Sequence, residues 1–514
     1  MLHTFCGIVI KVELACIRSN ATIPLSTQSA ANWFHYWACV HNNGVDYCNM
    51  GSLLFVGSFR TQHRMGLDVL VTSNRPMDHP LGWRVVAGSF MVQFLAFGVM
   101  NSYTTFTHLM EHDPQLGYPS KVQLSLGASI SAGIGPLLGV VAGYLVDRHG
   151  SRPMIFCVGL FLAFALLVGS FARSVAELVI LYSVPVSLAS ACTSSPVSTA
   201  IGSWFSKKLS IAFGVTYSGG GVGNAVLPLV AGHLAHSLND WRASFRYMSL
   251  FTILGLVATV LMSVRSSKGN DTKTEDSKLN GDASPGQDET REPLMKRIGS
   301  ALKIALPSKA FWAIYLCSFF FCYSFFGSLY VIIPYVTSFG SAPYQDREII
   351  KVERAASFFT WFGVAGVIGD ILVGVAGYAL NTKIAFSVCG VVGGIAGILL
   401  AFCSGYWSVG ITFTVIGFAY AGCFAMFPAL LVQHFLGPHL GTVMGLGFTC
   451  VGVAALTAAP LTAYIANHMS GDYTLSLALI GGNCLLGGII CQLFVPPPPI
   501  QSWQEEENVV AVVE

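Results

Sequence analysis

Long stretches without charged residues recur along this chain, and each is long enough to cross a lipid bilayer. A bilayer core about 30 Å thick needs about 20 apolar residues of helix. The sequence predicts twelve such spans, with boundaries good to a few residues: 84–108, 120–146, 153–172, 177–203, 209–235, 245–265, 309–338, 355–380, 383–404, 406–434, 440–466 and 473–495. The expected fold class is therefore an all-α membrane protein.

The composition excludes several other classes of protein. Of 514 residues, 53% are hydrophobic and 10% are charged, whereas soluble domains carry about 25% charged residues. The formal net charge of +2 argues against nucleic acid as a partner. Most cysteines lie inside apolar runs and lack CxxC or metal-ligand spacing, so we interpret them as small buried side chains. We expect neither a metal site nor a cofactor.

One polar segment divides the predicted spans into two sets of six. Residues 266–308 are rich in Ser, Asp, Glu, Lys and Gly and lack periodicity, which predicts a disordered linker. It separates an N-terminal six-helix half, 81–265, from a C-terminal six-helix half, 309–496. Residues 1–80 contain no piece that spans a bilayer, so we expect a poorly ordered tail; whether it belongs to the mature protein stays open. Residues 497–514 form a C-terminal tail.

The distribution of positive charge predicts the orientation of the chain. Cytoplasmic loops carry an excess of Lys and Arg, and the linker with its flanks contains Arg265, Lys268, Lys273, Lys278, Arg291, Lys296, Arg297, Lys303 and Lys309. The linker is therefore predicted to be cytoplasmic. Counting spans outwards then places both termini in the cytoplasm. We expect a multi-pass protein of the plasma membrane, in preference to an organelle membrane.

The most specific motif follows the second predicted span. Asp147 ends a helix at the membrane surface, where it can pair with Arg148, Arg152 or a neighbouring helix end, and Gly143 and Gly150 allow close approach and a tight turn. This pattern resembles the signature of the major facilitator superfamily. The resemblance implies twelve helices in two six-helix halves. It also implies that these five residues form a gate on the cytoplasmic side.

Further segments resemble the monocarboxylate transporter family within that superfamily. Asp78, followed by Gly82 and Trp83, is similar to the family's entry to the first span. The stretch from Gly417 through Pro460 to Tyr473 is similar to its last three spans. A second family signature enters the fifth span and comprises Trp204, Phe205, Lys207, Lys208 and Gly214. The likeness covers most of the chain from residue 78 to residue 495.

The chain departs from this family at the charges that bind a carboxylate substrate. Proton-coupled members carry a lysine in span one, where alignment from Gly82 and Trp83 places Asn101. They also carry an Asp and an Arg one helical turn apart in span eight. Here Asp370 is present, but no basic residue lies between Arg354 and Lys383. The inference of a monocarboxylate substrate is weakened accordingly.

Polar residues at membrane depth are costly and tend to face a cavity or another helix. Asn101 and Asn224, with Tyr323 and Tyr330, are the candidates for binding substrate; a hydrogen bond between packed helices is an equal alternative for the uncharged residues. Asp370 is the carboxylate that lies well inside a span. Because burial disfavours a charged carboxylate, we predict that Asp370 carries a coupling proton.

These observations favour a secondary transporter of small organic anions, above all monocarboxylates, that works by alternating access. Its expected partners are a small-molecule substrate, the lipid bilayer and, if transport is coupled, protons. A uniporter or exchanger for a neutral or other small solute is the alternative, and a non-transporting membrane receptor is a more remote one. The sequence has no GxxxxGK[ST] motif for ATP-driven transport and no clustered catalytic residues, so we do not expect an enzyme.

Overall fold

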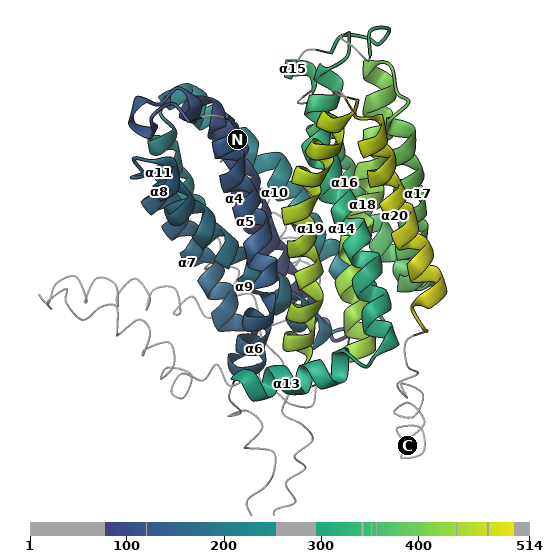
Figure 1. Cartoon of the computed structure of the whole chain (residues 1–514). Helices are drawn as coiled ribbons and strands as arrows, with labels where there is room; N and C mark the ends of the chain where they lie inside the picture. Colours follow the sequence, from purple (N-terminus) through teal and green to yellow (C-terminus); the bar gives the residue numbers. More distant parts are fainter. Residues whose placement is uncertain are drawn as a thin grey trace, which may run out of the picture. The chain divides into compact units, whose positions relative to one another are not determined.

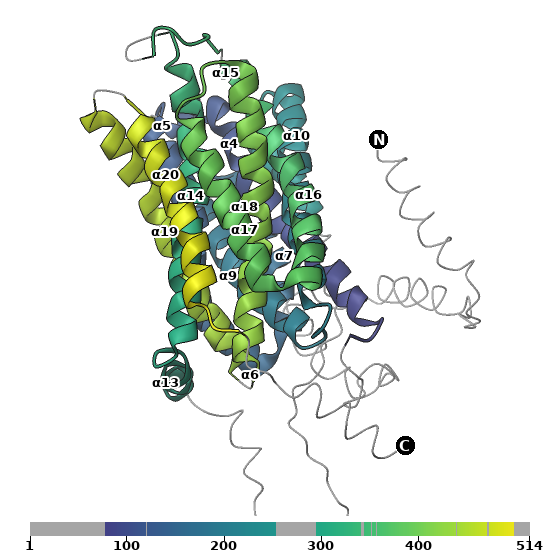
Figure 2. The same ribbon diagram turned by 90° about the vertical axis from the view of Figure 1, so that its right-hand side faces the viewer.

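The computed structural model describes residues 78–252, 294–437 and 439–497, apart from residues 120, 341–343, 351, 356 and 470–471. Within these ranges the chain is helical, with short turns and loops and no strand. Figures 1 and 2 show the helices from two directions. The predicted all-α class is confirmed. The predicted N-terminal tail up to residue 77, linker residues 266–293 and the C-terminal tail from residue 498 lie outside the described residues.

The described part of the first half contains seven helices of eleven residues or more and three shorter helical segments, all before residue 252. They are α4 (Gly82–Glu111), η4 (Pro114–Leu116), α5 (Lys121–Leu137), α6 (Gly139–His149), α7 (Ser151–Gly169), α8 (Val175–Leu178), the π-helical η5 (Val179–Ser183), α9 (Val184–Gly202), α10 (Leu209–Leu238) and α11 (Trp241–Phe251).

The second half follows from residue 294 onwards. Its helices are α13 (Leu294–Ala305), α14 (Lys309–Thr337), α15 (Val352–Ala355), α16 (Ser357–Leu380), α17 (Thr382–Leu400), α18 (Tyr406–Phe435), α19 (Leu440–His468) and α20 (Thr474–Phe494). Short connections make consecutive long helices run in opposite directions. The end of α6 and the starts of α10, α17 and α19 therefore share one end of the helices, which we call the gate end.

The described residues contain nine helices that are long and apolar enough to cross a membrane. A tenth span is the predicted second one, which consists of two segments bent by 48° between Leu137 and Gly139; Pro136 lies beside this break, where it removes a backbone donor. Helix α10 has 30 residues, but its glycines and Asn224 make it less apolar. The sixth predicted span begins in α11, and its residues 253–265 lie outside the described part of the chain.

The expectation that the whole linker lacks a fold is wrong for its last part. Residues Leu294–Ala305 form α13, which packs against α6 and α19 and lies beside α6 in Figure 1. Ala301 and Ala305 are fully buried there, whereas Lys296 and Lys303 are exposed. This short amphipathic segment gains stability from packing on its neighbours. The sequence analysis did not identify its amphipathic pattern, because the segment is short and follows a long polar stretch.

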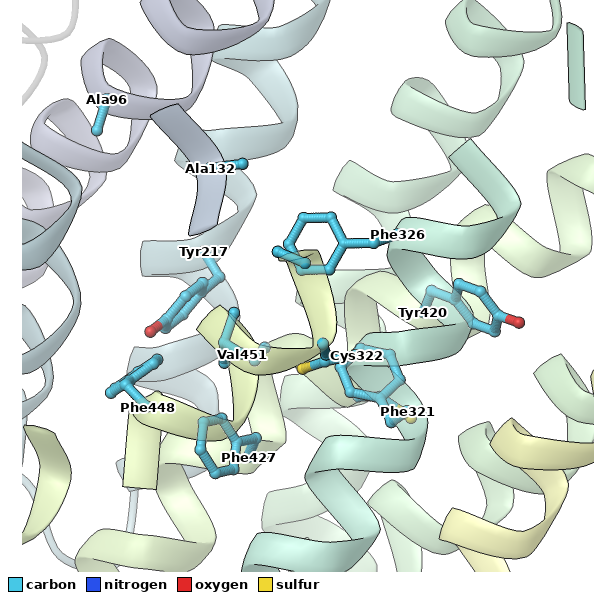
Figure 3. Close-up of a cluster of buried hydrophobic side chains, with 14 of the residues drawn as sticks. Ala96, Ala132, Tyr217, Phe321, Cys322, Phe326, Tyr420, Phe427, Phe448 and Val451 are labelled. Atoms are coloured by element: carbon cyan, nitrogen blue, oxygen red, sulfur yellow. The ribbon is translucent and has the colours of Figure 1, made fainter. Parts of the chain in front are cut away.

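Small residues bring helix backbones together, as their spacing predicts. A Cβ atom at Gly219 or Gly223 of α10 would meet the carbonyl oxygen of Phe90 or Phe94 of α4. Larger side chains from both halves share one buried cluster, among them Tyr217 of α10 and Phe427 of α18, shown in Figure 3. This arrangement places several polar residues of α4, α10 and α16 next to the boundary between the halves.

Candidate functional site

Asp147, near the end of α6, is bound to the beginning of α19 in the other half. Its Oδ1 accepts a hydrogen bond from the Gly441 N–H at 2.8 Å, and its Oδ2 accepts from the Thr442 N–H at 2.9 Å and the Thr442 hydroxyl at 2.6 Å. The first N–H groups of a helix have no partner within the helix and carry partial positive charge. Among the partners considered for Asp147, the neighbouring helix end is one that the structure shows.

Glycines allow α6 and α19 to come this close. A Cβ atom at Gly143 would overlap the carbonyl oxygen of Gly441, and one at Gly445 would overlap that of Gly139. Ser195 of α9 adds a 2.8 Å hydrogen bond from its hydroxyl to the Gly441 carbonyl. Backbone atoms cannot move aside as flexible side chains can. The contact therefore requires residues without side chains at these positions.

The other residues of the motif shape the turn between α6 and α7. Gly150 has φ +83°, a conformation that L residues with a Cβ rarely adopt. Arg148 donates a 3.0 Å hydrogen bond to the Tyr144 hydroxyl one turn earlier, and Arg152 is exposed at the start of α7. Neither arginine is the hydrogen-bond donor to Asp147 in the contacts above.

A second contact joins the halves at the gate end, between α10 and the end of α16 with the start of α17. The hydroxyls of Ser210 and Thr382 lie 2.7 Å apart. A Cβ atom at Gly214 would lie 3.0 Å from the Cα of Gly374 and would overlap the carbonyl oxygen of Asp370. Gly214, the last residue of the predicted family signature, is thus a point of close backbone approach.

The two family signatures predicted separately form one junction. The Asp78 carboxylate accepts hydrogen bonds from the Ser206 hydroxyl at 2.8 Å and from the backbone N–H groups of Lys207 and Lys208, each at 3.0 Å. The Asp78 N–H donates to the Trp204 carbonyl at 2.9 Å. Burial raises the pKa of Asp78, but the hydrogen bonds from Lys208, Ser206 and Lys207 together lower it by more. The pKa of Asp78 therefore lies below its usual value.

Aromatic packing strengthens this junction. The rings of Trp83 and Phe205 are 5.4 Å apart, and a Cβ atom at Gly82 would lie 2.9 Å from the Phe205 ring. The sequence identified both segments by their likeness to a family. It held no signal that they touch, because 122 positions separate Gly82 from Trp204.

Asn101 and Asn224 are brought together between α4 and α10. The Asn101 Nδ2 donates to the Asn224 Oδ1 at 2.8 Å and to the Phe97 carbonyl at 3.1 Å. Both residues are half-buried. The other two predicted substrate contacts lie on α14, where Tyr323 is buried and Tyr330 is half-buried.

Asp370 lies in the middle of α16, at 4% exposure. Its Oδ1 has no hydrogen-bond partner among the described residues, and Tyr217 of α10 lies nearby. The two residues are near enough to interact electrostatically across the boundary between the halves. Most buried polar groups in proteins are hydrogen-bonded, so such an unsatisfied carboxylate is a candidate for function.

Two arginines at the opposite end of the helices escaped the sequence analysis. Arg242 contacts the Asp113 carboxylate and donates to the Ala172 carbonyl at 3.0 Å. Arg347 donates to the Cys403 carbonyl at 2.9 Å and to the Ala401 carbonyl at 3.1 Å. Each fixes the C-terminal end of a neighbouring helix within its own half.

Known proteins resemble the chain in sequence along most of its length. A family model described as Major Facilitator Superfamily matches residues 85–378 and 350–511. The riboflavin transporter RibJ of Trypanosoma cruzi is 33% identical over 82% of this chain and 95% of its own length. RibJ of Trypanosoma brucei brucei is 27% identical over 82% of this chain and 94% of its own. Human monocarboxylate transporter 2 is 24% identical over 55% of this chain and 59% of its own.

Solved structures agree in fold. The proton:xylose symporter XylE matches with a TM-score of 0.61 at 14% identity, over 81% of this chain and 96% of its own. The Escherichia coli fucose:proton symporter FucP matches with a TM-score of 0.59 at 11% identity, over 80% of this chain and 100% of its own. Together with the matched family model, these findings show that the chain belongs to the major facilitator superfamily and is a multi-pass membrane transporter, not an enzyme.

Proposed function

We propose that this protein transports riboflavin or a closely related flavin by alternating access. The observation that carries the proposal is the similarity to two RibJ riboflavin transporters over 82% of the chain. The charges of the central helices agree with it: α4, α10, α14, α16 and α18 carry no Lys or Arg beyond their first turn. An uncharged solute needs no fixed cation, and amide side chains can supply its hydrogen bonds.

A monocarboxylate is the second candidate substrate. The signature junction around Asp78 and the similarity to human monocarboxylate transporter 2 support it. The lack of a lysine at Asn101 and of an arginine near Asp370 speaks against it, because an anion in a low-dielectric site requires compensating charge. Asn101, Asn224, Tyr323 and Tyr330 remain our proposed substrate contacts for either solute.

We further propose that Asp370 carries a coupling proton. A buried carboxylate without a hydrogen-bond donor is more stable in its neutral form, because burial disfavours the charged form. The Asp370 backbone also forms part of the close contact with Gly214. Separation of α10 from α16 would admit water to Asp370 and release the proton. Proton binding would thus favour the closed contact at the gate end.

The gate end is proposed to face the cytoplasm, with both termini and the linker on that side. Exposed Lys303 of α13 and Arg152 of α7 lie at this end, in accordance with the positive-inside rule. We place the protein in the plasma membrane. Asp147 and the glycines of α6 and α19 would then close the cytoplasmic side, while release of this contact would open it.

Uptake into proteoliposomes tests the choice of substrate. The purified full-length chain is reconstituted, and uptake of radiolabelled riboflavin and lactate is measured with and without a pH gradient, against liposomes that lack protein. Saturable riboflavin uptake without lactate uptake is expected. Lactate uptake without riboflavin uptake would replace the proposal by the second candidate. Uptake of neither solute would contradict both.

A further inference from the structure

Aromatic side chains from both halves meet in the centre of the protein. The ring of Phe424, on α18, lies 6.0 Å from that of Phe97 on α4 and 5.5 Å from that of Tyr217 on α10. Phe325 of α14 lies 5.7 Å from Phe424. Two of these helices belong to the first half and two to the second. The rings therefore form a cluster across the boundary between the halves.

Phe97, Phe325 and Phe424 are half-buried, although each packs against at least one other ring of the cluster. Phe424 contacts rings of both halves and therefore lies at the boundary between them. Phe164 of α7, on the outer surface, is 51% exposed by comparison. The three phenylalanines are thus partly exposed residues at the boundary where a solute between the halves would lie.

The asparagine pair continues the same surface by one helical turn. Phe97 and Asn101 are four residues apart on α4, as are Gly220 and Asn224 on α10, so each pair shares a helix face. A Cβ atom at Gly220 would lie 3.1 Å from the Phe97 ring. The absence of a side chain at Gly220 keeps the ring and the two amides close together.

A small hollow between α4 and α9 adjoins this surface. Phe97 is part of its lining, together with the side chains of Ser190, Thr193 and Ser194 on α9. The hydroxyl oxygens can still accept hydrogen bonds when they donate to their own helix. One side of the Phe97 ring thus borders hydroxyl groups of α9. One helical turn further along α4 lies the amide of Asn101, which is hydrogen-bonded to that of Asn224.

We propose that Phe97, Phe325 and Phe424 bind the planar ring of an uncharged heteroaromatic solute, with Asn101 and Asn224 hydrogen-bonded to its polar edge. This inference rests on the proposed flavin transport and assigns the parts of the solute. Aromatic rings attract one another in stacked or edge-to-face geometry. The amides provide donors and acceptors for the carbonyl and N–H groups at the edge of a flavin ring.

Binding to purified protein tests this site independently of transport. Full-length protein in detergent is titrated with riboflavin, and binding is followed by quenching of flavin fluorescence. Phe424→Leu and Phe97→Leu should each weaken riboflavin binding about tenfold, which is the order of one aromatic contact. Phe424→Tyr, which keeps an aromatic ring, should bind riboflavin as the wild type does. Phe164→Leu on the outer surface is the matched control and should bind as the wild type does. Thermal melting verifies that each variant is folded.

Competition separates recognition of the ring from recognition of the chain. Lumichrome, which has the ring system without the sugar-alcohol chain, should displace riboflavin from the wild type, and ribitol should not. Displacement by ribitol alone would overturn the assignment of the ring to the aromatic cluster. Unchanged affinity in both leucine variants would overturn the site and leave flavin transport intact. A wild type that neither binds nor transports riboflavin would overturn this site together with the proposed function.

Discussion

The carboxylate of Asp147 accepts a 2.8 Å hydrogen bond from the backbone N–H of Gly441, which lies 294 positions further along the chain. This bond joins the end of α6 in the first half to the start of α19 in the second. A charge-assisted hydrogen bond contributes about 1.5–3 kcal/mol. Loss of the bond can therefore shift the balance between open and closed gate by about tenfold or more.

Asp147→Asn is expected to lower the initial transport rate about tenfold, because its amide NH2 would face an N–H donor of α19. The residue lies at a hydrated end of the helix, so folding and membrane abundance should be retained. Proteoliposome uptake at matched protein amount measures the effect. Glu177→Gln is the control, since that carboxylate binds only locally, to the Arg173 N–H. An unchanged rate in Asp147→Asn would reduce the motif to a packing feature.

Gly143→Ala tests the close approach of α6 and α19 without a change of charge. The added methyl group would overlap the carbonyl of Gly441, and overpacking of this kind costs about 1–3 kcal/mol. We expect a closed gate to be disfavoured and transport to fall about tenfold. Gly482→Ala of α20, where a Cβ atom has open space, should transport normally. Equal rates for the two variants would contradict the role of Gly143.

Asp370→Asn should remove the dependence of uptake on a pH gradient, because an amide cannot bind and release the proton. Exchange of internal for external riboflavin should persist in the variant. Both are measured in proteoliposomes, with Asp346→Asn as a control carboxylate that is exposed in a loop. Accumulation driven by pH in Asp370→Asn, at matched protein amount, would place the proton carrier elsewhere. A wild type without pH dependence would favour a uniporter.

Asp78 should contribute to the pH dependence of stability. Its pKa is lowered in the folded protein, since hydrogen bonds from Lys208, Ser206 and Lys207 outweigh the effect of burial. The stabilisation is therefore present above the unfolded value of about 3.9 and is lost as pH falls through the folded pKa. Melting temperatures in detergent between about pH 7 and 3 should show Asp78→Asn to be less stable than wild type near neutrality. The difference should shrink below about pH 4; a constant difference would argue against the charged junction.

The orientation can be tested through the linker. A protease site inserted between Gly281 and Asp282 should be cut in inside-out vesicles and protected in sealed cells, because the positive-inside rule places the linker in the cytoplasm. A protease site inserted in the loop before Glu348, at the opposite end of the helices, is the matched control. It should be protected in inside-out vesicles and cut in sealed cells. Protection of the linker site in inside-out vesicles would invert the proposed topology of both termini.

The sequence by itself determined the class of protein, because uncharged runs of about 20 residues have few alternatives to membrane-spanning helices. The motif around Asp147 and the segments at Asp78 and Trp204 could also be recognised from the sequence. Each is defined by residue types at fixed spacings within a short segment. Helix α13 was missed, because its amphipathic pattern is short and follows a polar stretch, and its burial on α6 and α19 is a tertiary property.

Only the tertiary structure decided which of these residues meet. Asp147 is hydrogen-bonded to the start of α19, Asn101 to Asn224, and Phe424 lies between aromatic residues of the two halves. Such contacts join helices that are far apart in the chain, and helix packing in lipid depends on the fit of whole surfaces and on close backbone approach. A glycine permits that approach, but its position in the sequence does not predict which helix will pack against it.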